Sequence, residues 1–238
     1  MRLTIQTSLS QVFNRELNAW QKIIINHDLS LGEKLFKSWR QILGYAYNFY
    51  WRMGNECEQW IRIIMNQETK RLVSEIQPEK LNVLEISGSY WQDFDFLSYK
   101  SVAYPELDIC KSRLDEKFNL IIAEQVFEHL LWPYQAGRNI YEMLNYDGYF
   151  LITTPFLIGV HHCPIDCNRW TELGLKHFLA ECGFSLEQIK TGSWGNRQCL
   201  RSYANHGICE YYVKYWHSLK NEPLYPAVVW AIAHKTSK

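Results

Sequence analysis

The chain has 238 residues, and its 25 basic and 25 acidic side chains give a formal net charge of zero. A hydrophobic fraction of 47% excludes a disordered chain, and the absence of net positive charge argues against a nucleic-acid binder. No apolar run approaches the ~20 residues of a membrane span, and the first residues lack the layout of a secretion signal. The seven irregularly spaced cysteines indicate reduced thiols. We therefore expect a cytoplasmic protein without a membrane partner.

In residues 1–80 the apolar side chains recur at the period of an α-helix. Between Trp51 and Ile76 the apolar side chains fall on one helical face, and the part upstream is rich in aromatic residues. This region is expected to be a helical N-terminal extension that covers a ligand or forms a homodimer contact, with packing into the core as the alternative. Residues 81–238 are expected to form the main domain.

The pattern changes after Pro78 to short apolar runs separated by helical stretches. One helix is expected to end near Leu144, and another to run from its N-cap Thr171 to Cys182, where Gly183 ends it. Strands that alternate with helices indicate an α/β fold with a mostly parallel sheet. The last two predicted strands are expected to pair at one sheet edge. The predicted strands are Asn82–Ile86, Phe118–Ala123, Tyr149–Thr154, Ser185–Ile189 and Ala227–Ala233.

Polar side chains follow the predicted strands, and in parallel sheets the ligand binds beyond the carboxyl ends of the strands. The first strand enters Ser87-Gly88-Ser89, a turn of small residues that lets the backbone approach a ligand. Glu85, before this turn, can hold a cationic amine or position the turn. Glu124 and Gln125 follow the second predicted strand. The sequence therefore predicts a ligand site at this edge of the sheet.

Four motifs occur in a fixed order between Leu81 and the C-terminus. They are Val83–Ser89, Glu124–Leu130, Leu144–Phe150 before a strand that ends in Pro155-Phe156, and Arg169–Leu175 before Gly183-Phe184. This ordered set resembles the class I S-adenosylmethionine-dependent methyltransferases, in a branch associated with sugar and small-molecule biosynthesis. The resemblance implies a Rossmann-like sheet with an antiparallel last strand. It also implies S-adenosylmethionine as cofactor and a hydroxyl or, as second choice, an amine of a small molecule or saccharide as acceptor.

The chain departs from this family in two places. The family turn carries three glycines, whereas this turn has only Gly88. Gly88 and Phe118 are only thirty residues apart, which is too short for the two helices and two strands of the family, so we expect one helix-strand unit to be missing. These departures support an alternative function, a methyltransferase-like binding or scaffold protein without transfer activity.

The resemblance assigns cofactor binding to residues at the ends of the first strands. Asp108 either accepts the ribose hydroxyls or caps a turn, and Tyr90 and Trp91 either stack on adenine or pack against the sheet. The expected cofactor-binding set is Glu85, Ser87, Gly88, Ser89, Tyr90, Asp108, Glu124, Gln125 and Val126.

His161 is the expected general base, because an unperturbed imidazole is poised near neutral pH and this one follows a strand at the ligand edge. Asp166 orients His161 or pairs with Arg169 to brace the loop, so these three form the predicted catalytic set. The acceptor is expected to meet His129, His162, Trp194, Asn196 and Arg197. Alternatively, Trp194, Asn196 and Arg197 belong to a turn that does not contact the acceptor, with the arginine in solvent.

A metal-assisted mechanism is a third interpretation. In the ubiquinone-biosynthesis O-methyltransferases and the small-RNA 2′-O-methyltransferases, an E-x-x-E-H motif binds a divalent metal. Here Gln125 replaces the first acid, which would weaken such a site built from Glu128, His129 and His161. We therefore favour structural hydrogen bonds for Glu128 and His129, and expect no metal.

Overall fold

The computed structural model describes residues 58–161, 164–206 and 210–236. The compact unit in which they lie spans Cys57–Lys238. The N-terminal extension, expected to cover a ligand or form a homodimer contact, spans residues 1–80, and its first part, residues 1–57, lies outside the described residues. Its last part is described: helix α3 (Arg62–Ser74) and the short 3-10 helix η1 (Pro78–Lys80) belong to the same unit as the sheet.

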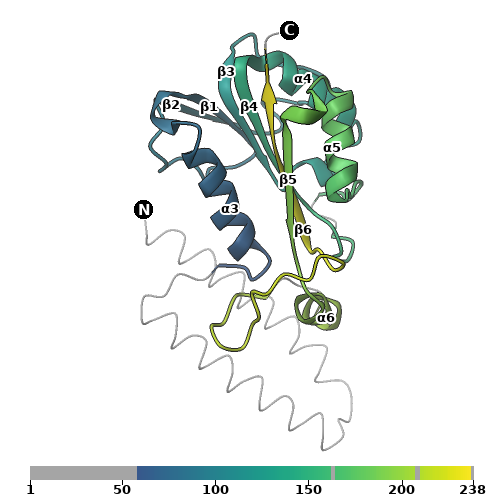
Figure 1. The fold of residues 1–238 in the computed structure, drawn as a ribbon. Helices are drawn as coiled ribbons and strands as arrows, with labels where there is room; N and C mark the ends of the chain where they lie inside the picture. Colours follow the sequence, from purple (N-terminus) through teal and green to yellow (C-terminus); the bar gives the residue numbers. More distant parts are fainter. Residues whose placement is uncertain (1–57, 162–163, 207–209, 237–238) are drawn as a thin grey trace, which may run out of the picture. The chain divides into compact units, whose positions relative to one another are not determined.

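A six-stranded sheet forms the centre of the domain, in the order β2-β1-β3-β4-β6-β5. The first four strands of this order are parallel, and β6 runs antiparallel to both β4 and β5 (Figure 1). The predicted mostly parallel sheet with an antiparallel last strand is thereby confirmed. The strands are β1 (Asn82–Ile86), β2 (Ser98–Val102), β3 (Phe118–Glu124), β4 (Leu144–Pro155), β5 (Ile189–Trp194) and β6 (Val228–Lys235).

Helices cover both faces of the sheet. Helices α4 (Pro133–Met143) and α5 (Glu172–Glu181) pack on one face and α3 on the other (Figure 1). Successive strand residues point to opposite faces, so Leu84 and Ile121 face α4 and α5 while Val83 and Leu120 face α3. Helix α6 (Arg197–His206) follows β5, and η2 (Phe127–His129) and η3 (Leu186–Gln188) are short 3-10 helices. None of the helices in the described residues could cross a bilayer.

The boundaries of α5 follow from its end residues. Thr171 is the N-cap, and its Oγ1 accepts a hydrogen bond from the Gly174 N–H at 3.0 Å. Gly183 adopts φ 123°, a value that glycine reaches without strain, and so ends the helix. The helix predicted from Thr171 to Cys182 is confirmed.

Two boundaries differ from the sequence prediction. The strand expected at Ser185–Ile189 begins only at Ile189, because the 3-10 helix η3 occupies the residues before it and leaves Leu186 exposed. β5 pairs with β6 at one edge of the sheet, as predicted, and β5 is the edge strand. β4 already begins at Leu144, before the predicted start at Tyr149, with the left-handed Asp147 at φ 60° inside the strand.

The connection from β1 to β3 is short, as the sequence predicted. Only β2 lies between them, and residues 87–117 contain no α-helix. Aromatic side chains fill the space beside the sheet instead: Trp91 is 1% exposed, and its ring lies 5.2 Å from that of Phe94. β2 itself is a half-exposed edge strand, so it lacks the apolar run by which a buried strand is recognised.

Candidate functional site

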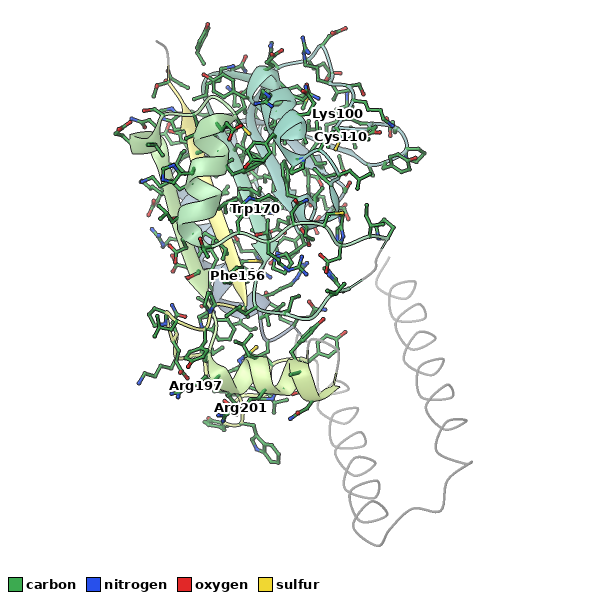
Figure 2. All side chains as sticks on the ribbon, turned by 90° about the vertical axis from the view of Figure 1, so that its right-hand side faces the viewer. Lys100, Cys110, Phe156, Trp170, Arg197 and Arg201 are labelled. Atoms are coloured by element: carbon green, nitrogen blue, oxygen red, sulfur yellow. The ribbon has the colours of Figure 1, made fainter. Side chains whose placement is uncertain are left out.

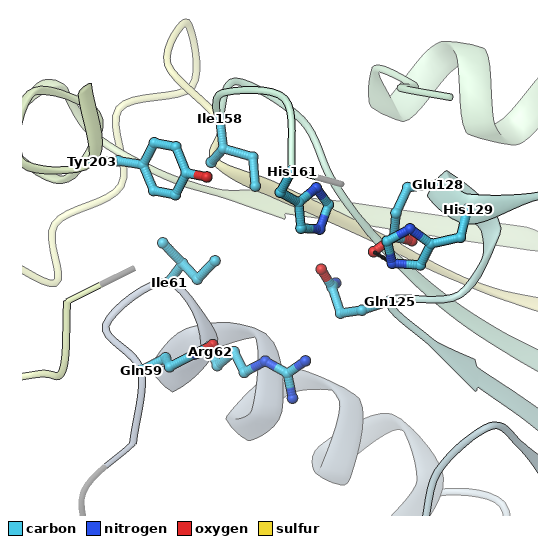
Figure 3. A pocket seen from close by; sticks show the side chains of 9 residues that line it. All are labelled: Gln59, Ile61, Arg62, Gln125, Glu128, His129, Ile158, His161 and Tyr203. Atoms are coloured by element: carbon cyan, nitrogen blue, oxygen red, sulfur yellow. Dashed lines mark ion pairs between the residues drawn. The ribbon is translucent and has the colours of Figure 1, made fainter. Parts of the chain in front are cut away.

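A cavity of about 360 Å³ opens at the carboxyl ends of β3 and β4 (Figure 3). Three groups of side chains line it: those that follow β3, those that follow β4, and those from the start of α3, with one side chain from α6. The lining residues are Gln125, Glu128 and His129, then Ile158 and His161, then Gln59, Ile61 and Arg62, and Tyr203. The cavity therefore lies where the sequence placed the ligand.

The loop after β4 joins His161, Asp166 and Arg169 into one unit. Asp166 Oδ2 accepts hydrogen bonds from the His161 backbone N–H at 2.8 Å and from its ring Nδ1 at 3.0 Å. Both Asp166 oxygens also accept from the Arg169 guanidinium, which donates through two nitrogens. Although burial raises the pKa of Asp166, the hydrogen bonds from Arg169 and His161 hold that pKa well below its usual range.

This geometry fixes the proton positions on His161. An ionised Asp166 accepts from Nδ1–H, so the other ring nitrogen, Nε2, keeps its lone pair and can take up a proton. The structure thus brings the predicted catalytic set together, with Asp166 both orienting His161 and pairing with Arg169.

Glu128 and His129 lie beside this unit. The Glu128 side chain is 0% exposed, and neither of its carboxylate oxygens has a hydrogen-bond donor among the described residues. Burial raises the pKa of Glu128 to about 7. His129 does form the structural hydrogen bond expected of it, through Nδ1 to the Ile165 carbonyl. With the residues that the structure describes, the Glu128 carboxylate forms none, against our expectation.

His129 and His161 approach each other over Glu128. Their ring centroids are 5.1 Å apart, and His129 Nε2 lies 3.6 Å from Glu128 Oε1. One nitrogen of each histidine and one Glu128 oxygen lie within 4.8 Å of one another, which is close enough for a single metal ion. Figure 3 shows the three side chains converging from the ends of β3 and β4.

A loop segment, residues 165–169, holds these side chains in place. Besides the Ile165 carbonyl bond, the Cys167 N–H donates to the Glu128 carbonyl at 2.7 Å. The Asn168 side-chain amide donates to the carbonyls of Leu130 at 2.6 Å and Phe127 at 3.2 Å. Nothing in the sequence marked Asn168, because its partners lie about forty residues away.

The turn after β1 is built around Glu85. Its carboxylate is buried and accepts from the Tyr90 and Trp91 N–H groups, each at 3.1 Å, and from the Tyr99 hydroxyl at 2.6 Å. A Cβ on Gly88 would collide with this carboxylate. Of its two possible roles, Glu85 therefore positions the turn, and the glycine is needed because of Glu85.

The residues at the end of β3 divide between cavity and core. Gln125, in a left-handed conformation at φ 54°, lines the cavity, and its side-chain amide donates to Thr153 Oγ1 at 3.0 Å. Glu124 keeps one buried carboxylate oxygen without a donor among the described residues, and burial raises its pKa to about 7. The Val126 side chain is 7% exposed and packs into the core cluster.

Asp108 and Trp91 take the structural alternative, whereas Tyr90 does not pack against the sheet. Asp108 accepts from the Cys110 N–H at 3.1 Å and pairs with Lys111 at 3.0 Å, so it caps a turn and does not line the cavity. Trp91 is buried against the sheet. Tyr90 is 42% exposed, and the Lys70 ammonium lies 4.9 Å from its ring centroid.

The wall expected from residues 194–197 is not part of the cavity. Trp194 is buried and donates to the Leu219 carbonyl at 3.0 Å. Asn196 donates to the Ser218 and Lys220 carbonyls. Arg197, at the start of α6 (Figure 2), pairs with Glu222 at 2.6 Å. The polar groups of these three side chains therefore all bind residues of the segment 218–222.

Tyr203, further along α6, lines the cavity where the residue 194–197 wall was expected. Tyr203 packs close to Gly159 of the loop after β4. Gln59, Ile61, Arg62 and Ile158 were also missed, and only Ile61 stood out, as part of the apolar helical face. The remaining acceptor residue, His162, lies outside the described residues.

The mostly parallel sheet with its antiparallel β6 is the Rossmann-like sheet that the resemblance implied. No protein-family model and no curated protein matches the chain. Among solved structures it is similar to an Archaeoglobus fulgidus SAM-dependent methyltransferase, at 14% identity and TM-score 0.48, over 80% of this chain and 100% of that one. A possible histamine N-methyltransferase from Thermotoga maritima has 11% identity and TM-score 0.47, over 74% and 98% of the chains. A Mesorhizobium loti SAM-dependent methyltransferase has 13% identity and TM-score 0.43, over 69% and 96%.

Proposed function

We propose that this protein transfers a methyl group from S-adenosylmethionine to a hydroxyl or amine of a small molecule or saccharide, with His161 as general base. The observation that carries this proposal is the His161–Asp166–Arg169 unit on the wall of the cavity. A cavity of about 360 Å³ has the volume of a small-molecule site. A scaffold protein would have no need of an oriented imidazole there.

The residues at the ends of β1 and β3 fit S-adenosylmethionine. Ser87 and Ser89 are exposed at the turn, and the buried Glu124 Oε1 has no donor among the described residues, so an ammonium or hydroxyl group of the cofactor could supply one. The turn residues Ser87–Tyr90, with Glu124 and Gln125, would hold the cofactor. When bound, S-adenosylmethionine supplies a methyl group that is already activated by its sulfonium.

The protein's own contribution is to orient the acceptor and accept its proton. Asp166 holds His161 so that Nε2 is the atom that takes the proton, and Arg169 keeps Asp166 ionised in this role. His129 and Gln125 on the cavity wall can hydrogen-bond the acceptor. Positioning and proton removal are what the transfer of an activated methyl group requires.

Calorimetric titration with S-adenosylmethionine and S-adenosylhomocysteine tests this proposal. We expect both to bind with micromolar dissociation constants, and Glu124→Ala to weaken both, because the buried carboxylate is lost. Glu106→Ala, which removes an exposed acid outside the cavity, is the matched control. If neither compound binds the wild-type protein at millimolar concentration, the binding or scaffold alternative replaces the enzyme.

A second candidate, a metal-assisted methyltransferase, is favoured by the surroundings of His129 and His161. Each uses Nδ1 for an outer partner, the Ile165 carbonyl or Asp166, as metal-binding histidines do. Both histidines keep Nε2 for a ligand, and Glu128 adds a carboxylate that has no donor within the part of the chain that the structure describes. These residues fit a divalent ion such as Mn²⁺ or Zn²⁺. A bound ion would lower the pKa of an acceptor hydroxyl.

The metal candidate predicts that the purified protein binds Mn²⁺ in a calorimetric titration and that Glu128→Gln weakens this binding at least tenfold, because a charged ligand is lost. Glu142→Gln removes an exposed acid and serves as control. EDTA is expected to abolish turnover, and Mn²⁺ or Mg²⁺ to restore it. Full turnover in EDTA would contradict the metal candidate and leave His161 as the sole base.

A further inference from the structure

The cavity has an apolar end and a polar end, with His161 between them. Ile158 packs against the apolar cluster that contains Ile61, and both line the cavity together with Tyr203. A Cβ on Gly159 would stand 3.1 Å from Cε1 of Tyr203, so α6 lies directly against the loop after β4. In Figure 3 the three lining side chains lie on one side of the His161 ring, and the polar side chains of η2 lie on the other.

The apolar end, formed by Ile61, Ile158 and Tyr203, lies away from the turn that we propose to hold the cofactor. That turn follows β1, and β3 separates β1 from β4 in the sheet order. Ile158 follows β4, and Tyr203 belongs to α6, which follows the edge strand β5. The apolar end is therefore the part of the cavity that is available to the acceptor.

Tyr203 is held in place through the start of its helix. The Asn196 side chain accepts from the Cys199 N–H at 2.8 Å and donates to the Ser218 carbonyl at 3.0 Å. The Gln198 side chain accepts from the Ser218 N–H at 3.1 Å. These bonds fix α6 on the segment that follows it, so the Tyr203 ring forms a fixed wall of the apolar end.

An aromatic acceptor fits this end better than a saccharide. A sugar carries a hydroxyl on nearly every ring carbon, and each hydroxyl that leaves water needs a new hydrogen-bond partner. The side chains of Ile61 and Ile158 offer none. A planar apolar ring, by contrast, buries its surface against the two isoleucines and packs against the Tyr203 ring.

The proposed base also suits an aromatic hydroxyl. A phenol ionises at a pH of about 10, whereas an aliphatic hydroxyl is about as weak an acid as water. Asp166 holds the His161 imidazole through Nδ1 and leaves Nε2 to accept a proton. An imidazole held in this way removes the proton of a phenol far more readily than that of a sugar hydroxyl.

Building on the proposed function, we infer that the acceptor is a phenol whose aromatic ring lies at the apolar end and whose hydroxyl faces His161 Nε2. The phenol oxygen forms a bond to the methyl carbon while the bond between that carbon and the cofactor sulfur breaks. The electron pair of the broken bond stays on sulfur, which gives S-adenosylhomocysteine. The phenol proton moves to His161 Nε2 and from there to water, and the product is an aryl methyl ether.

Calorimetric titration of 2-naphthol into the protein saturated with S-adenosylhomocysteine tests the apolar end. We expect Tyr203→Ala to raise the dissociation constant at least tenfold, because the aromatic wall is lost. Tyr203→Phe keeps the ring and should change the constant less than twofold. Tyr146→Ala removes a 72% exposed ring near the start of β4, at the other end of that strand, and is the matched control.

Ile158→Asn is a second variant, because it places an amide in the same wall without touching Tyr203. It should also weaken 2-naphthol binding at least tenfold. The melting temperature of each variant verifies folding, so the inference can still be tested if one of the two substitutions prevents it. An unchanged affinity for 2-naphthol in the folded Tyr203→Ala or Ile158→Asn protein would overturn the inference.

Turnover separates the two acceptor classes. With S-adenosylmethionine labelled in its methyl group, we expect the wild type to label at least one of phenol, catechol and 2-naphthol, and to leave methyl β-glucoside unlabelled. Labelling of the glucoside, or of none of the phenols by a protein that binds S-adenosylmethionine, would show that the acceptor is not a phenol.

Failure of the proposed function has a different signature, because the wild type would then bind neither S-adenosylmethionine nor S-adenosylhomocysteine. The 2-naphthol titration is in that case run on the protein alone. Binding that Tyr203→Ala weakens at least tenfold would retain the apolar end as a site for phenols without methyl transfer. Absent binding, or equal binding to the wild type and Tyr203→Ala, would overturn the inference as well.

Discussion

Replacing His161 with alanine is expected to lower kcat by a factor of about 10² to 10⁴, the range that a general base contributes. The affinity for S-adenosylhomocysteine should stay within twofold of the wild type, since the residues proposed to hold the cofactor follow β1 and β3. Steady-state kinetics with an acceptor identified by screening, together with calorimetry, measure the two quantities.

His177→Ala is the matched control, because it removes an exposed imidazole from α5 outside the cavity. Asp166→Asn should reproduce much of the loss, since an amide neither fixes the His161 tautomer nor balances the Arg169 charge. If His161→Ala retains more than half of the wild-type kcat, the base assignment is wrong. A loss that accompanies weaker Mn²⁺ binding would point to the metal candidate.

Replacing Glu128 with glutamine is expected to stabilise the protein at pH 8 and to have little effect at pH 4. Burial raises the pKa of Glu128 from an ordinary 4.5 to about 7 in the folded protein. Between these values the folded state binds more protons than the unfolded state, so the wild type loses stability as pH rises through this window. Above pH 7 the penalty is on the order of 3 kcal/mol, and glutamine, which does not ionise, escapes it.

Urea denaturation of the wild type and Glu128→Gln at both pH values measures this difference. Glu106→Gln, at an exposed position, should gain no stability at pH 8 relative to pH 4. Equal stability gains of Glu128→Gln at the two pH values would show that Glu128 is not protonated by burial. A gain at pH 8 together with loss of ligand or metal binding would show that this carboxylate is retained for function at the expense of stability.

The buried parts of the fold could be predicted from the sequence. β1, β3 and β6 lie within two residues of their predicted bounds, because strands covered on both faces appear as continuous apolar runs. β2 was missed and β5 displaced, since both are edge strands with exposed polar residues. The edges of the sheet thus carry a weaker signal than its centre.

The site was predictable where its residues follow the strand ends within one motif. His161, Asp166 and Arg169 lie within nine residues of one another, and the structure brings them together. The structural role of Trp194 and Asn196 could not be predicted in this way. The carbonyls that bind them come from residues 218–220, more than twenty positions later. Arg62 and Tyr203 reach the cavity only through helix packing, which no local pattern reveals.

The loop of residues 165–169 holds the site with alternating backbone and side-chain groups. Ile165 and Cys167 contribute only their main chains to these bonds, and their side chains are exposed. Asp166, Asn168 and Arg169 contribute side chains. Ile165 and Cys167 can therefore change during evolution without moving an atom of the site. In sequence, such a site is recognised by an acid, an amide and an arginine at positions 166, 168 and 169, with any residue at position 167. A search for continuous motifs would overlook this interrupted pattern.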